Sequence, residues 1–113
     1  MARTKVFAKA DPLGEVVRSF AVNEEINQLL IERLDPAAWR AKVPRTRTRT
    51  IAAIFVHMHH VRRKWLRLSA PHLPLPAELD RNCTQAQARK ALKASGVRCM
   101  EMIEQLLTSD FTA

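Results

Sequence analysis

Three segments of the chain carry apolar residues at the spacing of an α-helix with one buried face. The first predicted helix covers about residues 23–34, with a cap at Asn23 and apolar positions at Ile26, Leu29, Leu30 and Leu34. The second covers about 51–68, after a cap at Thr50, and its apolar stripe is Ile51, Ile54, Phe55, Met58, Val61 and Trp65. The third covers about 84–108, and its stripe is Ala88, Leu92, Ser95, Cys99, Met102 and Leu106. The pattern predicts an all-α helical bundle with three main helices.

The segments before and between the first two helices are less regular. The start of the chain is mixed, with a turn predicted at 11–14 and a short helical piece at 15–20. Proline disfavours a helical residue before it, so Asp35-Pro36 ends the first helix and suits the start of another short turn. Residues 42–50 alternate arginine and threonine with little apolar material to bury, which predicts a solvated loop.

The last connection is long and stiff. Three prolines forbid a regular helix over residues 69–83. Thr84 then stands three residues before Gln87, which is the spacing of a helix capping box. We therefore expect a connection that crosses an end or a side of the bundle rather than a tight hairpin. Gly96, within the third helix, costs helix propensity and suits a close contact between helices.

Length and composition narrow the class of protein. The 113 residues suit one domain over 1–113, and 47% hydrophobic beside 27% charged residues is a globular composition. No apolar run approaches the roughly 18 uncharged residues of a membrane span, and no apolar region of a secretory signal follows the first residues. Cys83 and Cys99 fall about 20 Å apart along the helix axis, too far for a disulfide. Free thiols favour a cytoplasmic location.

The net charge of +8 is unevenly distributed. Residues 36–77 contain nine basic residues and no acidic one. This asymmetry favours an anionic partner, either nucleic acid or another polyanion, and it also fits a solvated face that aids solubility. For Arg62, beside the apolar stripe, we expect an extended stem or a carboxylate partner. The candidate anion-binding residues are Arg45, Arg47, Arg49, Arg63, Lys64 and Arg67.

The histidines offer one candidate metal ligand. His57, His59 and His60 lie on the second predicted helix. At about 100° per residue, His57 borders the apolar stripe and projects toward a pocket between helices, whereas His60 lies on the outer face. A metal site needs three or four ligands that converge on one point. His57 is therefore either a metal ligand or a border histidine that bonds a backbone carbonyl or water.

Three phrases of the sequence are similar to segments of one known family. They are Asn-Glu-Glu-Ile-Asn-Gln-Leu-Leu from position 23, Leu-Asp-Pro-Ala-Ala-Trp from position 34, and Thr-Ile-Ala-Ala-Ile-Phe-Val-His-Met-His-His-Val-Arg-Arg-Lys-Trp-Leu from position 50. With them the chain resembles the DinB family of small, damage-inducible-type helical proteins. The resemblance extends over about residues 22–107 and is most specific around His57.

The resemblance implies a fold and a partial site. DinB-like proteins are four-helix bundles with a long crossover, and they usually hold a divalent metal, often zinc or nickel, with three histidines. The ligand on the second helix falls on His57 here. The other two ligands form a His-x-x-x-His pair on a fourth helix, and no histidine follows His72 in this chain. Some relatives are thiol-dependent transferases or hydrolases, but one ligand of three implies a chain that is not catalytic alone.

The missing fourth helix also has an expected packing consequence. A bundle without one of its helices exposes an apolar groove of several hundred Å², which is a size typical of interfaces and of aggregation-prone surfaces. We therefore expect either a homo-oligomer that associates through this groove or a poorly stable fragment.

Overall fold

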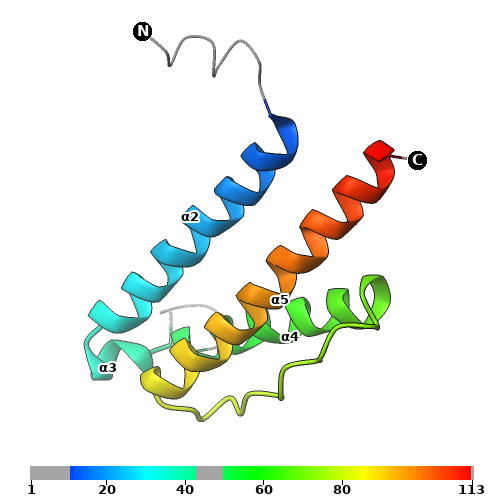
Figure 1. Ribbon diagram of the computed structural model, residues 1–113. Coiled ribbons are helices and arrows are strands. Elements are labelled where there is room, and N and C mark those ends of the chain that lie inside the picture. The colour runs from blue at the N-terminus through cyan, green and yellow to red at the C-terminus, as the bar shows by residue number, and fades with distance from the viewer. Residues whose placement is uncertain (1–10, 43–49, 113) are drawn as a thin grey trace, which may run out of the picture.

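Four helices make up the regular structure in the computed structural model, which describes residues 11–42 and 50–112. They are α2 (Pro12–Arg33), α3 (Pro36–Trp39), α4 (Ile51–Ser69) and α5 (Gln85–Thr112) (Figure 1). Within the described ranges, the only β-type pairing is an isolated bridge between Lys42 and Thr50. The predicted all-α class is confirmed. In these same ranges no helix combines the length and the apolar character that crossing a membrane requires.

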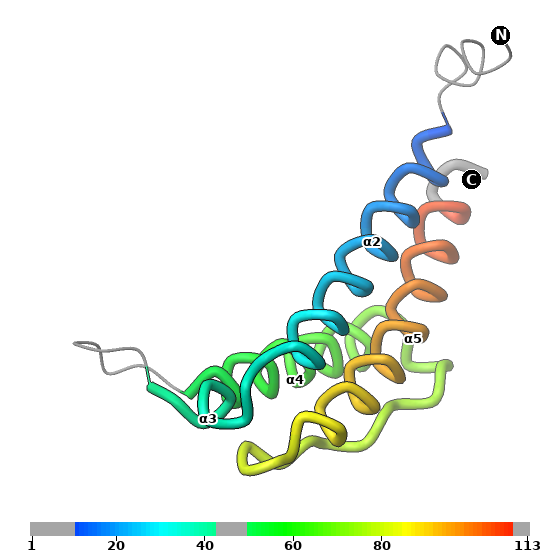
Figure 2. Tube along the Cα trace, turned by 90° about the vertical axis from the view of Figure 1, so that its left-hand side faces the viewer, coloured from blue at the N-terminus to red at the C-terminus, as the bar shows by residue number. Residues whose placement is uncertain are grey.

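The three long helices form a bundle in which α5 packs against both α2 and α4. Helix α2 runs antiparallel to α5, whereas α4 and α5 point in the same general direction (Figures 1 and 2). Two parallel neighbours need a connection that returns to the starting end of the bundle. Residues 70–84 supply it as an extended segment along the side of α4 and α5, which confirms the predicted crossover.

Two of the helix caps predicted from the sequence, at Thr50 and Thr84, are present, whereas the cap predicted at Asn23 is wrong because Asn23 lies inside α2. Thr50 Oγ1 accepts a hydrogen bond from the Ala53 N–H at 3.1 Å, so α4 begins where its sequence signal stands. At the start of α5 the capping box is reciprocal: the Gln87 N–H donates to Thr84 Oγ1 at 3.1 Å, and the Thr84 N–H donates to Gln87 Oε1 at 2.9 Å. Asp35 caps α3 in the same manner, through the Ala37 N–H at 2.9 Å.

Helix α2 begins eleven residues before the predicted start at Asn23, at Pro12. The turn predicted over 11–14 is wrong, because proline at the first helical position has a favourable backbone angle and lacks only an N–H that would be unpaired there. The Asp11 carbonyl accepts the Glu15 N–H at 2.8 Å and closes the first helical turn. The extra length places the apolar side chain of Phe20 against α4 and α5.

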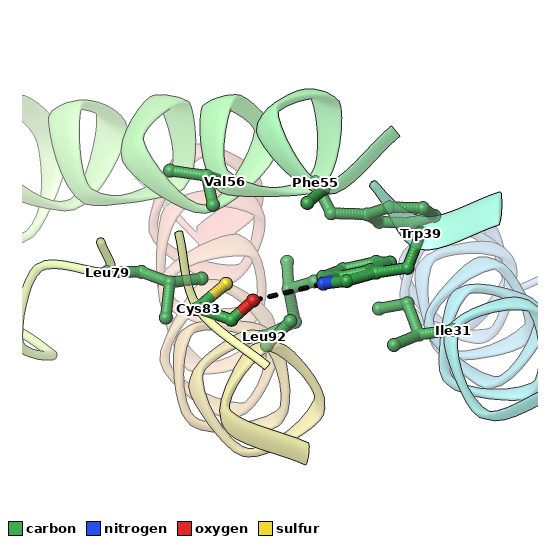
Figure 3. Packing of buried hydrophobic residues seen from close by; sticks show 9 residues of the cluster. Ile31, Trp39, Phe55, Val56, Leu79, Cys83 and Leu92 are labelled. Carbon is green, nitrogen blue, oxygen red and sulfur yellow. Dashed lines mark hydrogen bonds between the residues drawn. The ribbon is translucent and has the colours of Figure 1, made fainter. Parts of the chain in front are cut away.

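The core consists of two clusters of buried side chains along the bundle. In the first, the Trp39 ring stacks on Phe55 with ring centroids 5.8 Å apart, and Trp39 Nε1 donates to the Cys83 carbonyl at 3.0 Å (Figure 3). The second cluster is Leu66, Ala70, Cys99 and Met102, with Phe20, Leu73 and Ile103 packed against it. Cys83 and Cys99 are both buried and free, so the expectation of no disulfide is confirmed.

Two contacts set the distance between α2 and α5. Gln85 Nε2 donates to the carbonyls of Ile31 and Leu34 at 2.8 and 2.7 Å, so the first residue of α5 satisfies the end of α2. Further along, a Cβ placed on Gly96 would lie only 3.1 Å from the Glu24 carboxyl carbon. The close helix contact predicted at Gly96 is confirmed, and it is made with a side chain that is itself fixed.

Arg62 on α4 connects all three long helices. Its guanidinium donates to Glu24 Oε1 of α2 at 2.6 Å and to the Leu92 carbonyl of α5 at 2.8 Å. It also lies 5.2 Å from the centre of the Phe20 ring, in a cation–π contact. The Arg62 and Glu24 side chains are only 11% and 14% exposed, so this ion pair is mostly shielded from water. The carboxylate partner expected for Arg62 is therefore Glu24.

We predict that Arg62→Met lowers the free energy of unfolding by about 3 kcal/mol, because it leaves the Glu24 carboxylate buried without its counter-charge. The double variant Arg62→Met/Glu24→Leu should recover most of this loss, since it removes both charges from the interior. Urea unfolding followed by circular dichroism measures both changes. Arg18→Met is the matched control: its ion pair with Glu15 is exposed, and its loss should cost less than about 1 kcal/mol.

Candidate anion-binding face and buried histidine

The face of α4 that is buried differs from the predicted one. Its buried residues are Ala52, Phe55, Val56, His59 and Leu66. From the predicted stripe, Ile54 and Trp65 are 42% and 55% exposed. The centre of the buried row lies about 100° around the helix from the centre of that stripe. Polar groups cause this rotation, because His59 and Arg62 take positions toward α5 that an apolar pattern would not assign to the core.

This rotation corrects the geometric expectation for His57. The His57 side chain is exposed at the surface and does not lie in a seam between helices. The histidine that α4 buries is His59, which has no solvent exposure. The sequence does carry a signal for it: the spacing of Ala52, Val56, His59 and Leu66 is helical once a polar residue is allowed in a buried row.

The hydrogen bonds of His59 define its protonation. His59 Nε2 lies 2.7 Å from the Ala77 carbonyl oxygen, which can only accept, so this nitrogen carries the proton. Nδ1, which has no proton in this tautomer, lies 3.1 Å from Ser95 Oγ as an acceptor for its hydroxyl, and the Leu92 carbonyl at 3.2 Å is a second acceptor for the same hydroxyl proton. Burial lowers the pKa of His59 below its usual value near 6.5; the bond to Ala77 opposes this shift, and nearby cationic side chains on α4 reinforce it. The ring is therefore neutral at pH 7.

The Ser95–His59 pair has the atoms of a nucleophile and its base, but not their accessibility. Ser95 has no solvent exposure, and its oxygen also accepts a hydrogen bond from Arg62 at 3.2 Å. Burial raises the pKa of the Cys83 and Cys99 thiols as well, so both stay protonated at neutral pH. A substrate cannot reach this serine, and the group acts as a buried polar network that connects α4, α5 and the crossover.

His57 and His60 line a hollow at the surface of α4. The hollow has a volume of about 320 Å³, and its other wall includes Leu79 and Arg81 from the crossover. His60 Nε2 accepts a hydrogen bond from the Leu79 N–H at 3.2 Å, so this nitrogen carries no proton. The neutral ring then holds its proton on Nδ1, which is a hydrogen-bond donor and not a metal ligand. The hollow therefore combines an arginine, an exposed imidazole and an imidazole N–H.

The basic residues predicted on α4 divide into two groups. Lys64 and Arg67 are exposed, one and two turns beyond His60. Arg63 is engaged: its Nε donates to the Pro76 carbonyl at 2.7 Å, and its guanidinium lies 3.6 Å from Glu78. Arg63 therefore fastens the crossover to α4 instead of facing a ligand. The remaining candidates, Arg45, Arg47 and Arg49, lie outside the described residues.

Sequence reasoning missed Arg81. It follows the proline-rich segment and has no spacing relation to the histidines of α4, so only the path of the crossover brings it to their hollow. A metal centre of three or more His, Cys, Asp or Glu side chains is absent from the ranges 11–42 and 50–112. Comparisons with protein-family models, with curated proteins and with solved structures found no match for this chain. The DinB-like relationship stays a prediction.

We predict that the free energy of unfolding decreases as the pH is lowered from about 6.5 to about 5, because the unfolded chain binds a proton at His59 more readily than the folded chain does. For a single group the slope is at most about 1.4 kcal/mol per pH unit. Urea unfolding at a series of pH values measures it. His59→Gln should flatten the curve in this range, and the exposed His57→Gln should leave it unchanged. Equal slopes in the wild type and in His59→Gln would contradict the assignment.

Proposed function

We propose that the chain is a helical binding module that holds a polyanion, with the phosphate backbone of nucleic acid as its ligand, on what we call the basic face: His57, His60, Lys64, Arg67 and Arg81. The observation that carries the proposal is the hollow formed by His57, His60 and Arg81, which continues along α4 into the exposed Lys64 and Arg67. Helix α4 contains no acidic residue that would repel an anion there.

The spacing of these residues suits an extended ligand. Steps of three, four and three residues keep His57, His60, Lys64 and Arg67 along one side of a helix, over about 15 Å of its axis. A nucleic acid presents a phosphate every few ångströms along each strand, so such a row meets several of them. The hollow beside Arg81 offers hydrogen-bond donors to one phosphate, and the two exposed cations attract the next ones. Attraction of this kind is sequence-independent and sensitive to salt.

A divalent cation, zinc or nickel as the DinB resemblance implies, is the second candidate. The observation that favours it is that His57 and His60 line the same hollow. Two features weigh against it: the Leu79 N–H occupies the lone pair of His60 Nε2, and Arg81 adds a positive charge to the same hollow. A metal there would have His57 as its one free imidazole ligand, which makes a partial site without a catalytic role of its own.

We predict that a fluorescent single-stranded oligonucleotide of about 20 nucleotides binds with a Kd that rises at least about tenfold between about 50 and 200 mM salt. Fluorescence anisotropy measures this change. Lys64→Gln/Arg67→Gln should weaken binding at low salt and reduce the salt slope by about 1.4, since each cation removed from a contact with a single strand lowers the slope by about 0.7. Lys90→Gln/Lys93→Gln, on exposed positions of α5, is the charge-matched control and should bind like the wild type.

Three results would reject the proposal: no binding at low salt, binding without salt dependence, or equal weakening in the Lys90→Gln/Lys93→Gln control. A zinc titration by calorimetry separates the second candidate. Stoichiometric zinc binding that is lost in His57→Ala, together with no oligonucleotide binding, would support the metal site instead.

A further inference from the structure

The structure leaves a set of large apolar side chains exposed on two helices. They are Val16, Val22, Ile26, Leu29 and Leu30 on α2 and Ile54, Trp65 and Leu68 on α4, and each is between 42% and 68% exposed. Most of α2's predicted core stripe is in this set, and Ile31 is the one residue of α2 that is buried. We call six of these exposed residues the α2–α4 apolar face: Val16, Ile26 and Leu30 on α2, with Ile54, Trp65 and Leu68 on α4. The other two, Val22 and Leu29, lie on the far side of α2 from Phe20, and Leu29 lines a hollow with Arg89 and Lys93 of α5.

The two exposed stripes lie on the same side of the molecule. Viewed along the α2 axis, three side chains follow one another in steps of about 80°. They are Gln28, which hydrogen-bonds α5, then Phe20, which contacts Arg62 of α4, and then the exposed Leu30. Around α4 the corresponding order is His59 toward α5, Arg62 toward α2, and then the exposed Trp65, in steps of about 60°. Both stripes therefore come just past the contact between α2 and α4, on the side that faces away from α5.

We propose that a second copy of this chain covers the α2–α4 apolar face, so that the protein is a two-fold symmetric dimer. The area supports this occupant: six side chains about half exposed offer roughly 600 Å², which is the share of each partner in an interface at the lower end of the standard size. The face has one apolar stripe on each of two helices, so a second copy turned by 180° can present the same face to it, as a two-fold interface requires.

Charge selects which helix meets which. Besides Arg62 and Arg63, which are paired within the chain, α4 carries Lys64 and Arg67 and no acid, so α4 against α4 of the partner would oppose like charges. Besides Glu24, which is paired with Arg62, helix α2 carries three glutamates, Glu15, Glu25 and Glu32, against two arginines. The favourable arrangement therefore places α2 of one copy on α4 of the other. The two faces adjoin on α4: Lys64 lies about 100° around the helix from Trp65 and about 40° from Leu68.

Sedimentation velocity from about 1 to about 100 µM, the range in which a micromolar dimer dissociates, tests the proposal. The wild type should shift from 12.9 kDa toward twice that mass. Leu30→Glu and Ile54→Lys should each remain monomeric at the highest concentration, with wild-type circular dichroism. Val97→Glu, at a 51% exposed apolar position on α5, is the matched control and should dimerise normally.

A mixture of Leu30→Glu with Ile54→Lys tests the arrangement of helices. If α2 meets α4 of the partner, one of the two symmetric contacts in the mixed dimer is entirely wild type and the other pairs glutamate with lysine, so the mixture should dimerise. Trp65 gives a second signal, because dimerisation should protect it from acrylamide quenching while Trp39, 2% exposed, is protected already. A monomeric wild type, loss of the dimer in Val97→Glu, or a monomeric mixture would each overturn the proposal.

Discussion

The structure depends on one buried guanidinium. Arg62 meets the Glu24 carboxylate of α2, a carbonyl and a hydroxyl of α5, and the ring of Phe20, so the three long helices converge on a single side chain. A buried charged group tolerates little displacement, because water cannot replace a hydrogen bond that the group loses, and the lost bond is therefore costly in free energy. Helix α4 therefore has one permitted rotation about its axis, and this rotation decides which of its residues are buried and which face outward.

The parts of the fold that follow from local chemistry could be predicted. The caps at Thr50 and Thr84, the proline-rich crossover and the stripe of α5 from Ala88 to Met102 are properties of neighbouring residues, and each was found where its signal stands. The rotation of α4 could not be predicted in this way. Its apolar positions spread over about two-thirds of its circumference. The choice between two overlapping faces depends on Arg62 and His59, whose hydrogen-bond partners lie between 18 and 38 residues away along the chain.

The same limit applies to the candidate site. Assigning His57 to a seam was a consequence of choosing the wrong face, and the hollow it lines instead is completed by Arg81, which reaches α4 only through the path of the crossover. Once the rotation is fixed, α4 has three distinct sides: a buried polar and apolar row toward α5, a cationic row beside the crossover, and an apolar row past α2. One helix can therefore serve the core and two surfaces of different chemistry.

The two clusters of buried side chains do not extend along the whole length of α2 and α5. The last buried side chains toward the chain ends are those around Phe20 and Met102, beyond which α2 and α5 continue together without α4 between them (Figure 1). Leu106 shows the consequence: it continues the buried stripe of α5, yet it is 42% exposed. Backbone amides in this two-helix end have few tertiary contacts to break before they open, so it can fray in amide hydrogen exchange while the three-helix end stays protected.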